Sequence, residues 1–155
     1  MGQKAKEASY ELGVASPGQK NEALTFMAEE LIKAKEEIIK ANEIDRQNAI
    51  KKGITDALLD RLSLDDSRIE AMAQGLLDIV KLQDPVGEVT NMWQMPNGLQ
   101  IGQKRVPIGV LGIIYESRPN VTSDAAGLCL KSGNAVILRG ASDAINSNKA
   151  VAKAL

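Results

Sequence analysis

The residues best suited to chemistry gather in two short polar segments, and each segment follows an apolar run. The first segment spans residues 116–120 and comes directly after the run 108–115. The planar guanidinium of Arg118 matches a carboxylate or a phosphate. The side-chain amide of Asn120 can donate a hydrogen bond to an oxygen that gains negative charge. Glu116, Ser117 and Pro119 complete the set of candidates here. The alternative is a proline–asparagine turn that only closes a loop.

The second polar segment spans residues 139–142 and follows the apolar run 135–138. Arg139 offers a second fixed positive charge, and Ser142 offers a hydroxyl group. Gly140 lacks a Cβ, so a ligand could approach its backbone closely. The alternative is that Arg139 is a surface arginine at the end of a strand.

The two apolar runs must be positioned side by side for these segments to cooperate. Residues 108–114 and 135–139 read as buried strands, and residues 123–131 between them read as a helix that ends at 132–134. A strand–helix–strand order is typical of a parallel sheet in a nucleotide-binding α/β domain, where ligands bind beyond the carboxyl ends of the strands. The usual glycine-rich phosphate loop is absent, because Gly109 and Gly112 do not form the G-x-G-x-x-G pattern.

The first 82 residues predict helices. Residues 1–15 have apolar residues at helical spacing, and Ser16, Pro17 and Gln19 form a helix start with a capping box. One apolar stripe continues to Ile39, and the helical pattern runs on to a terminating glycine, Gly53. Two further helices are expected, from Thr55 to Leu62 and from Asp65 or Asp66 to about Leu82. The final helix begins near Ser142 or Asp143 and is still running at Leu155.

Between the helices and the sheet, residues 86–95 and 99–106 alternate like strands. Asn97 and Gly98 lie between them, which is a strong signal for a β-hairpin. Such a hairpin has little core of its own. One reading of it is a solvent-exposed flap, and Trp93 is expected to be an interface or packing residue rather than a platform for a substrate.

Several segments of the chain closely resemble the gamma-glutamyl phosphate reductase family of the aldehyde dehydrogenase superfamily. The segments that carry the likeness are 4–10, 60–62, 84–87, 105–110, 115–122 and 128–140. The resemblance implies an α/β fold. N-terminal helices are followed by a β-hairpin and by the start of an aldehyde-dehydrogenase-like parallel sheet with flanking helices, which is an incomplete Rossmann-like NADP-binding domain.

The resemblance also implies a reaction, the NADPH-dependent reduction of L-glutamyl 5-phosphate to L-glutamate 5-semialdehyde with release of phosphate, the second step of proline biosynthesis. In that family a cysteine thiolate attacks the acyl phosphate, and the asparagine at the position of Asn120 donates to the oxyanion. Arg139 takes the position of a lysine in NAD-using relatives, and Ser142 takes the position of a ribose-binding glutamate. Because a carboxylate would repel a 2′-phosphate and an arginine attracts it, these two residues favour NADPH.

The resemblance further implies a division of the chain. Residues 1–85 and 108–155 are expected to form the N-terminal part of the cofactor-binding domain, and residues 86–107 the hairpin of an oligomerisation element in a homo-oligomer. The domain with the catalytic cysteine is expected downstream, so this polypeptide alone should be inactive. The alternatives are another acyl-phosphate or acyl-CoA reductase of the superfamily, or a non-catalytic interaction module of the same fold, against which the unfinished last helix argues.

The composition argues against several other classes of function. The net charge is −1 with scattered basic residues, so neither a nucleic acid nor an anionic membrane is expected as a partner. The chain has no histidine, which argues against metal hydrolysis and a Ser-His-Asp triad, and no metal site is expected. No apolar run is long enough for a membrane span or a signal peptide, and a single cysteine fits a reducing cytoplasm.

Three further residues need an interpretation. Cys129 lies between Leu128 and Leu130 in the expected helix, so we expect a buried, unreactive thiol rather than a nucleophile. Lys20 and Asn21, near the start of the long helix, are expected to face either the substrate or the solvent, and the sequence does not choose between the two.

Overall fold

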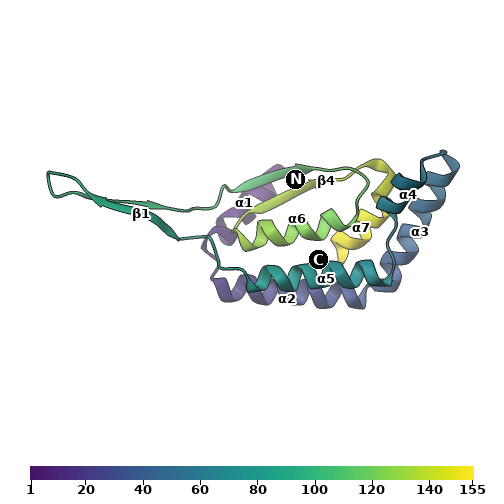
Figure 1. Ribbon diagram of the computed structural model, residues 1–155, viewed down its shortest axis with the longest axis horizontal. Helices are drawn as coiled ribbons and strands as arrows, with labels where there is room; N and C mark the ends of the chain where they lie inside the picture. The colour runs from purple at the N-terminus through teal and green to yellow at the C-terminus, as the bar shows by residue number, and fades with distance from the viewer.

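The strands and helices of the chain form the predicted α/β arrangement, with a two-stranded hairpin projecting from one end (Figure 1). The computed structural model describes residues 1–155. The elements are α1 (Gly2–Val14), α2 (Pro17–Lys33), α3 (Lys35–Lys51), α4 (Asp56–Leu62), α5 (Asp66–Lys81), β1 (Val89–Gln94), β2 (Gln100–Lys104), β3 (Val110–Ile114), α6 (Asn120–Lys131), β4 (Ala135–Arg139), the short 3-10 helix η1 (Ser142–Ala144) and α7 (Ile145–Ala154).

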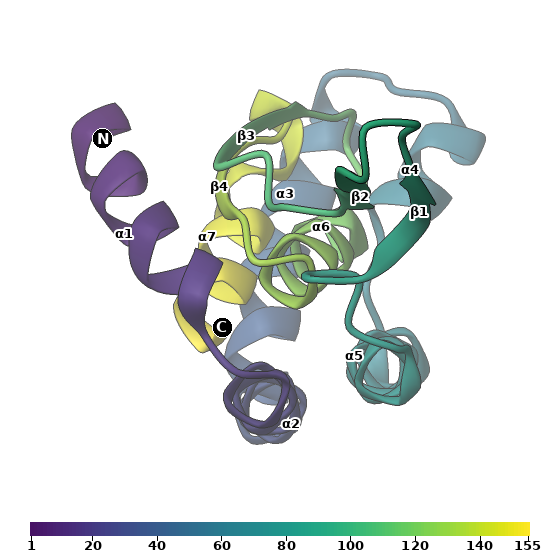
Figure 2. The same ribbon diagram turned by 90° about the vertical axis from the view of Figure 1, so that its left-hand side faces the viewer.

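Strands β3 and β4 form the predicted parallel sheet, with α6 as the connection between them. The register runs from Val110 opposite Ala135 to Ile114 opposite Arg139. Figure 2 shows α1 on one side of the strand pair and α6 on the other. The prediction that these strands are buried is wrong for this chain. Ile114 is 85% exposed, because a sheet of two strands leaves part of its surface uncovered.

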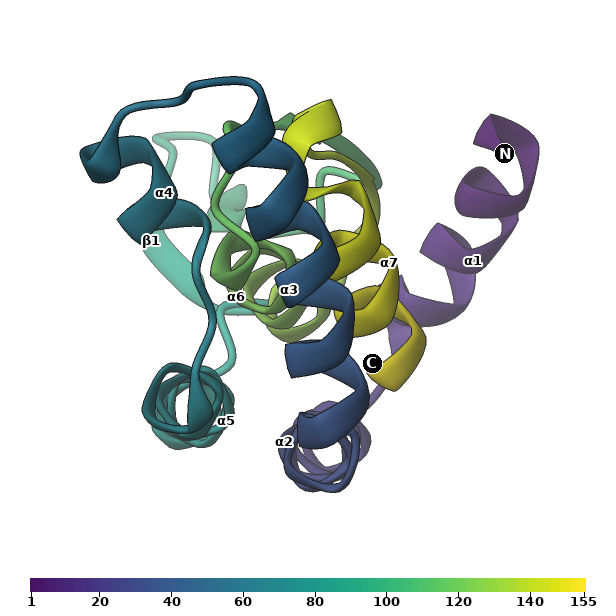
Figure 3. The same cartoon turned by 90° about the vertical axis from the view of Figure 1, so that its right-hand side faces the viewer.

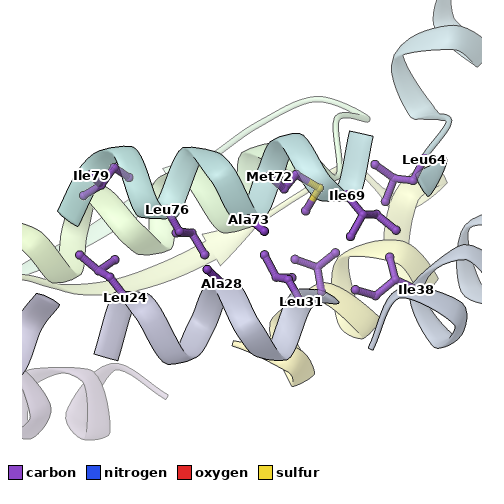
Figure 4. Close-up of a cluster of buried hydrophobic side chains, with 11 residues drawn as sticks. Leu24, Ala28, Leu31, Ile38, Leu64, Ile69, Met72, Ala73, Leu76 and Ile79 are labelled. Atoms are coloured by element: carbon purple, nitrogen blue, oxygen red, sulfur yellow. The ribbon is translucent and has the colours of Figure 1, made fainter. Parts of the chain in front are cut away.

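The main hydrophobic core lies below the sheet, where α2 and α5 run side by side (Figure 4). The leucine, isoleucine, methionine and alanine side chains of the two helices point toward each other, as the 3.6-residue period of their apolar positions predicts. The cluster consists of Leu24, Ala28, Leu31, Ile38, Leu64, Ile69, Met72, Ala73, Leu76, Ile79 and Val151. Val151 belongs to α7, so the last helix of the chain is part of this core.

The long helix that the sequence predicts from residue 17 to residue 52 is two helices. The helix is interrupted at Ala34, which separates α2 from α3 and has a φ of −83° and a ψ of 3°. No proline or glycine marks this position in the sequence. Packing accounts for the break, because it turns α3 so that it lies along α7 (Figure 3).

The predicted helix boundaries are confirmed at most ends. Ser16 and Gln19 form the reciprocal capping box of α2, and the side chain of Asp65 accepts the backbone N–H of Arg68 at the start of α5. Gly53 follows α3 with a φ of 72°. Thr55 precedes α4 as expected, although its side chain makes no capping hydrogen bond.

The β1–β2 hairpin forms where the Asn97–Gly98 signal predicts it. It extends away from the rest of the chain, and every residue of β1 is exposed (Figure 1). Gly98 has a φ of 87°, as the tight turn requires. The hairpin thus has no core of its own, as predicted, and Trp93 remains 43% exposed.

Both readings of Lys20 are wrong, because this lysine faces neither a substrate cleft nor solvent. Its side chain is 1% exposed, and its Nζ lies 2.8 Å from an oxygen of Asp84 at the base of the hairpin. Asn21 is also occupied, since its side-chain oxygen accepts a hydrogen bond of 2.6 Å from the buried Lys131. The two residues join α2 to the base of the hairpin and to α6.

The Lys20–Asp84 pair predicts a specific dependence of stability on pH. Burial alone would raise the pKa of Asp84. The hydrogen bonds from Lys20 and from the Val86 N–H, with the charges of Lys20 and Lys131, outweigh that effect and hold the pKa below its usual range. A lowered folded-state pKa stabilises the fold above the unfolded-state pKa of about 4, and this contribution is lost as the pH falls through the folded-state value.

We therefore expect Asp84→Asn to lower the free energy of unfolding most at neutral pH, with a difference from the wild type that shrinks below about pH 5. Urea unfolding between pH 3 and pH 7 measures this difference. Glu22→Gln is the control, since Glu22 is exposed and makes no ion pair. A constant difference across the pH range would contradict the prediction.

Candidate functional site

The two polar segments singled out in the sequence meet at the carboxyl edge of the sheet. The Tyr115 N–H donates to the Arg139 carbonyl at 3.1 Å, just past the point where β3 and β4 end. Because the strands are parallel and in register, residues that follow them lie at the same edge. The ends of the two strands thus lie side by side, as predicted.

Asn120 begins α6, three residues before the predicted start of that helix. Asn120 is therefore part of a helix, and not of a turn that only closes a loop. Its carbonyl accepts the Ser123 hydroxyl at 2.8 Å, and its side-chain Nδ2 donates to Asp124 Oδ2 at 3.2 Å. An amide group carries two N–H bonds, so this contact leaves one donor of Asn120 for a ligand. The positive end of the α6 dipole adds to the preference for negative charge at this position.

Asn120 and Arg118 line a cleft of about 460 Å³ between the α4–α5 corner and the start of α6. Its walls are mostly polar. The lining residues are Asp60, Arg61, Ser63, Leu64, Arg68, Ala71, Met72, Arg118, Asn120 and Asp124. Reasoning from the sequence missed Arg61, Arg68 and Asp124 as site residues. Asp124 could have been found, because it lies one helical turn after Asn120.

Some charges in this cleft are already paired within the protein. Arg68 donates to Asp60 Oδ1 at 2.6 Å and to the Ser63 carbonyl at 2.8 Å, so it closes the α4–α5 corner. Glu116 lies between the other two arginines. One of its oxygens is 2.7 Å from Arg118 Nε, without the alignment of a hydrogen bond, and the other is 3.6 Å from an Nη atom of Arg61.

Asp124 stands apart from these pairs. Asn120 is its hydrogen-bonding partner, and no lysine or arginine forms an ion pair with it. Burial raises the pKa of Asp124, and the hydrogen bond from Asn120 opposes that shift only in part. The cleft therefore holds a carboxylate whose charge is not compensated by the protein.

Gly140 is required by contacts inside the protein. A Cβ at this position would lie 2.1 Å from Asn148 Nδ2 and 3.0 Å from the ring of Tyr115. Tyr115, Thr122 and Asn148 form a chain of contacts, with 2.7 Å between the hydroxyl oxygens of Tyr115 and Thr122 and 3.3 Å from the Thr122 hydroxyl to Asn148 Oδ1. Close packing at the strand ends is thus a reason for this glycine that the sequence did not reveal, and the close approach of a ligand stays a prediction.

Arg139 and Ser142 do not line the same hollow. The Arg139 side chain is exposed, forms no ion pair, and borders a hollow of about 520 Å³ over the uncovered sheet surface, with Gly112, Ile113, Ile114 and Ile137. Ser142 borders a hollow of about 310 Å³ with Lys51 and Lys52, and the Lys52 Nζ lies 2.6 Å from Asp143. Ser117 and Pro119 lie in the turn before α6, and neither lines the cleft of Asn120.

Cys129 is buried in α6, as its apolar neighbours predict. Its side chain is 3% exposed, and burial raises the pKa of the thiol. A thiol with a raised pKa is a poor nucleophile at neutral pH. No group of three acidic, cysteine or histidine residues is arranged to hold a metal ion. None of the helices combines the length and the apolar character that crossing a membrane requires.

Comparison with known proteins supports the resemblance seen in the sequence. No protein-family model matches the chain. The gamma-glutamyl phosphate reductase of Clostridium beijerinckii is 71% identical over 154 residues, which is 99% of this chain and 37% of that protein. The chain thus spans little more than a third of the length of the curated relatives it matches.

Solved structures give the same result for the fold. The gamma-glutamyl phosphate reductase of Thermotoga maritima superposes with a TM-score of 0.94 at 48% identity, over 98% of this chain and 37% of that one. A probable aldehyde dehydrogenase of Listeria monocytogenes superposes with a TM-score of 0.61 at 16% identity, over 98% of this chain and 32% of that one, which is a likeness of fold alone. The predicted resemblance and the predicted aldehyde-dehydrogenase-like fold are both confirmed.

Proposed function

From its similarity to gamma-glutamyl phosphate reductases, which extends over nearly all of its own residues, we propose that this chain is the N-terminal part of such an enzyme. The enzyme reduces L-glutamyl 5-phosphate to L-glutamate 5-semialdehyde and releases phosphate, as a cytoplasmic step of proline biosynthesis. The observation that carries the proposal is the position of Asn120. It lies at the start of a helix, at the carboxyl edge of the sheet and in a polar cleft, and one N–H of its side-chain amide is free to donate to a ligand.

Asn120 stabilises the negative charge that develops on the substrate carbonyl oxygen during reduction. Its amide is held by Asp124, so it does not reorganise when the charge forms, and preorganised donors of this kind are worth several kcal/mol in the transition state. The nucleophile comes from residues outside this segment, because Cys129 is buried in α6. The 155-residue chain alone is therefore inactive.

NADPH supplies the hydride for this reaction. Arg139 is suited to hold the cofactor because its guanidinium is exposed at the end of β4 and has no partner in the protein. Ser142 adds a hydroxyl group at a position where a carboxylate would repel a phosphorylated ribose, and its hollow is lined by Lys51 and Lys52 together with Asp45 and Asp143. Glu116, Ser117, Arg118, Pro119 and Gly140 complete the cofactor side of the strand ends.

A fluorescence titration of the chain with NADPH and NADH tests this cofactor assignment. We expect NADPH to bind more tightly, and Arg139→Ala to weaken NADPH binding about tenfold while it leaves NADH binding nearly unchanged, because an arginine–phosphate contact is charge-assisted. Arg105→Ala is the matched control, since Arg105 pairs with Glu88 at the base of the hairpin. Equal losses for both nucleotides would show that Arg139 does not read the 2′-phosphate.

The hairpin, residues 86–107, contacts a partner subunit in the assembled enzyme. Support comes from its exposure, since Met92 and Trp93 of β1 lie on opposite faces of the hairpin and are 65% and 43% exposed. Residues 1–85 and 108–155 form the part of the cofactor-binding domain contained in this chain.

A further inference from the structure

The cleft beside Asn120 contains an unpaired carboxylate and a loosely paired guanidinium. Asp124 has no cation as a partner. The guanidinium of Arg61, which lines the same cleft, makes no hydrogen bond within the protein, and its nearest acidic oxygen belongs to Glu116 at 3.6 Å. Arg61 therefore has several N–H donors available for a ligand.

We propose that this cleft binds the α-amino-acid end of the substrate, with Asp124 receiving the α-ammonium group and Arg61 receiving the α-carboxylate. The proposal rests on the proposed function for the identity of the amino acid, which is a glutamyl group. A ligand with one positive and one negative group matches the unpaired Asp124 and the loosely paired Arg61, whereas a simple anion would leave Asp124 unpaired.

The other charged residues of the cleft lie closer to opposite charges within the protein than Asp124 and Arg61 do. Arg68 and Asp60 pair with each other at 2.6 Å, and Arg68 also donates to the Ser63 carbonyl. Arg118 lies against Glu116 at 2.7 Å. This leaves Arg61, which is half exposed and loosely paired, and Asp124, which is unpaired.

The spacing along α6 agrees with a glutamyl group. Asp124 follows Asn120 by four residues, and its Oδ2 lies 3.2 Å from Asn120 Nδ2, so the two groups are neighbours on one face of the helix. The 5-carbonyl carbon and the 2-amino nitrogen of a glutamyl chain are four bonds apart, and rotation about these bonds can bring both groups to one side of the chain. A substrate whose carbonyl oxygen meets the free N–H of Asn120 can therefore place its ammonium beside Asp124.

The energetics of Asp124 also favour a ligand role. Burial raises the pKa of this carboxyl, so the folded chain favours its ionised form less than water does. An asparagine at this position would keep the hydrogen bond to Asn120 without that cost. A ligand ammonium would supply the positive charge that the protein lacks at this point.

Binding of three small ligands to the 155-residue chain, followed by NMR, tests the assignment group by group. L-glutamate carries both α-groups, glutarate lacks the ammonium, and 4-aminobutyrate lacks the α-carboxylate. We expect Asp124→Asn to weaken L-glutamate and 4-aminobutyrate about tenfold but to spare glutarate, because it removes one charged hydrogen bond. Arg61→Gln should weaken L-glutamate and glutarate about tenfold and spare 4-aminobutyrate.

Two matched variants control for general changes of charge. Asp78→Asn alters a carboxylate on the outer surface of α5, and Arg105→Gln alters an arginine that pairs with Glu88 at the base of the hairpin. Neither should change the binding of any of the three ligands. Thermal unfolding verifies that every variant is folded.

The proposal is supported if Asp124→Asn spares only glutarate and Arg61→Gln spares only 4-aminobutyrate, which is the crossed pattern of losses. Absence of L-glutamate binding by the folded wild-type chain, or equal losses for all three ligands in either variant, would overturn it. Those results would leave the NADPH titration untouched, so the proposed function could stand while this assignment fails. A chain that binds L-glutamate in the crossed pattern but ignores NADPH would instead point against the cofactor assignment alone.

Discussion

Replacing Asn120 by alanine is expected to lower kcat of the enzyme that contains this segment by about 100- to 1,000-fold, with a much smaller effect on KM. The loss falls on kcat because the amide donor meets the substrate oxygen most strongly when that oxygen carries negative charge. The alanine also leaves Asp124 without its hydrogen-bond donor. Steady-state kinetics with L-glutamyl 5-phosphate, or in the reverse direction with the semialdehyde, measures both parameters.

Gln47→Ala is the control for this substitution, since Gln47 is exposed on α3 and donates to Glu43 four residues away on the same helix. The free energy of unfolding of the Asn120 variant should be close to that of the wild type, because the hydrogen-bonding partner of the side chain lies on the same helix. Wild-type kcat in a folded Asn120→Ala enzyme would rule out the oxyanion role. A loss confined to KM would instead make Asn120 a ground-state binding residue.

Replacing Asp45 by alanine is expected to lower the free energy of unfolding by about 3 kcal/mol, because several hydrogen bonds to one buried carboxylate are lost together. Asp45 is 2% exposed on α3. Its two oxygens accept the backbone N–H groups of Asn146 and Ser147 at 3.3 and 2.7 Å, the Asn146 side chain at 2.7 Å and the Ser147 hydroxyl at 2.6 Å. The carboxylate thus satisfies donors at the start of α7, which α7 cannot satisfy itself.

Urea unfolding of the Asp45→Ala chain measures this loss, and Asp66→Ala is the matched control. Asp66 lies at the surface, 69% exposed, and pairs with Lys35 at 2.7 Å, so its removal should change stability little. A similar free energy of unfolding for both variants would mean that other groups or water replace the carboxylate of Asp45 at α7.

The Asp45 contacts also affect the functional segment, because α7 directly follows β4 and η1. Asn42, one turn earlier on α3, adds hydrogen bonds to Ser147 at 3.0 Å and to the Leu62 carbonyl at 2.8 Å. Together these residues fix the end of β4 against α3 and the α4–α5 corner. A destabilised Asp45 variant should therefore bind NADPH more weakly than its folded fraction alone would explain.

Local signals in the sequence were sufficient to predict most helices and strands of this fold. The Ser16–Gln19 capping box, the Asn97–Gly98 turn and the two apolar runs around α6 each depend on residues close together in the chain, so their physics can be read without the partner elements. The same holds for the meeting of the two strand ends, because a helix between two apolar strands leaves a parallel pair in register as the stable arrangement. The burial of Cys129 followed from its apolar neighbours.

The tertiary structure decided what depends on contacts between distant residues. The break at Ala34 has no local signal and follows from the packing of α3 against α7. Lys20 meets Asp84 across 64 residues, and Arg61 reaches the cleft of Asn120 from a different helix. The exposure of Ile114 shows the same limit, since a strand that is apolar in sequence is buried only where another element covers it. Pairing of charges and coverage of apolar surface are properties of the assembled layers, and the sequence order alone does not contain them.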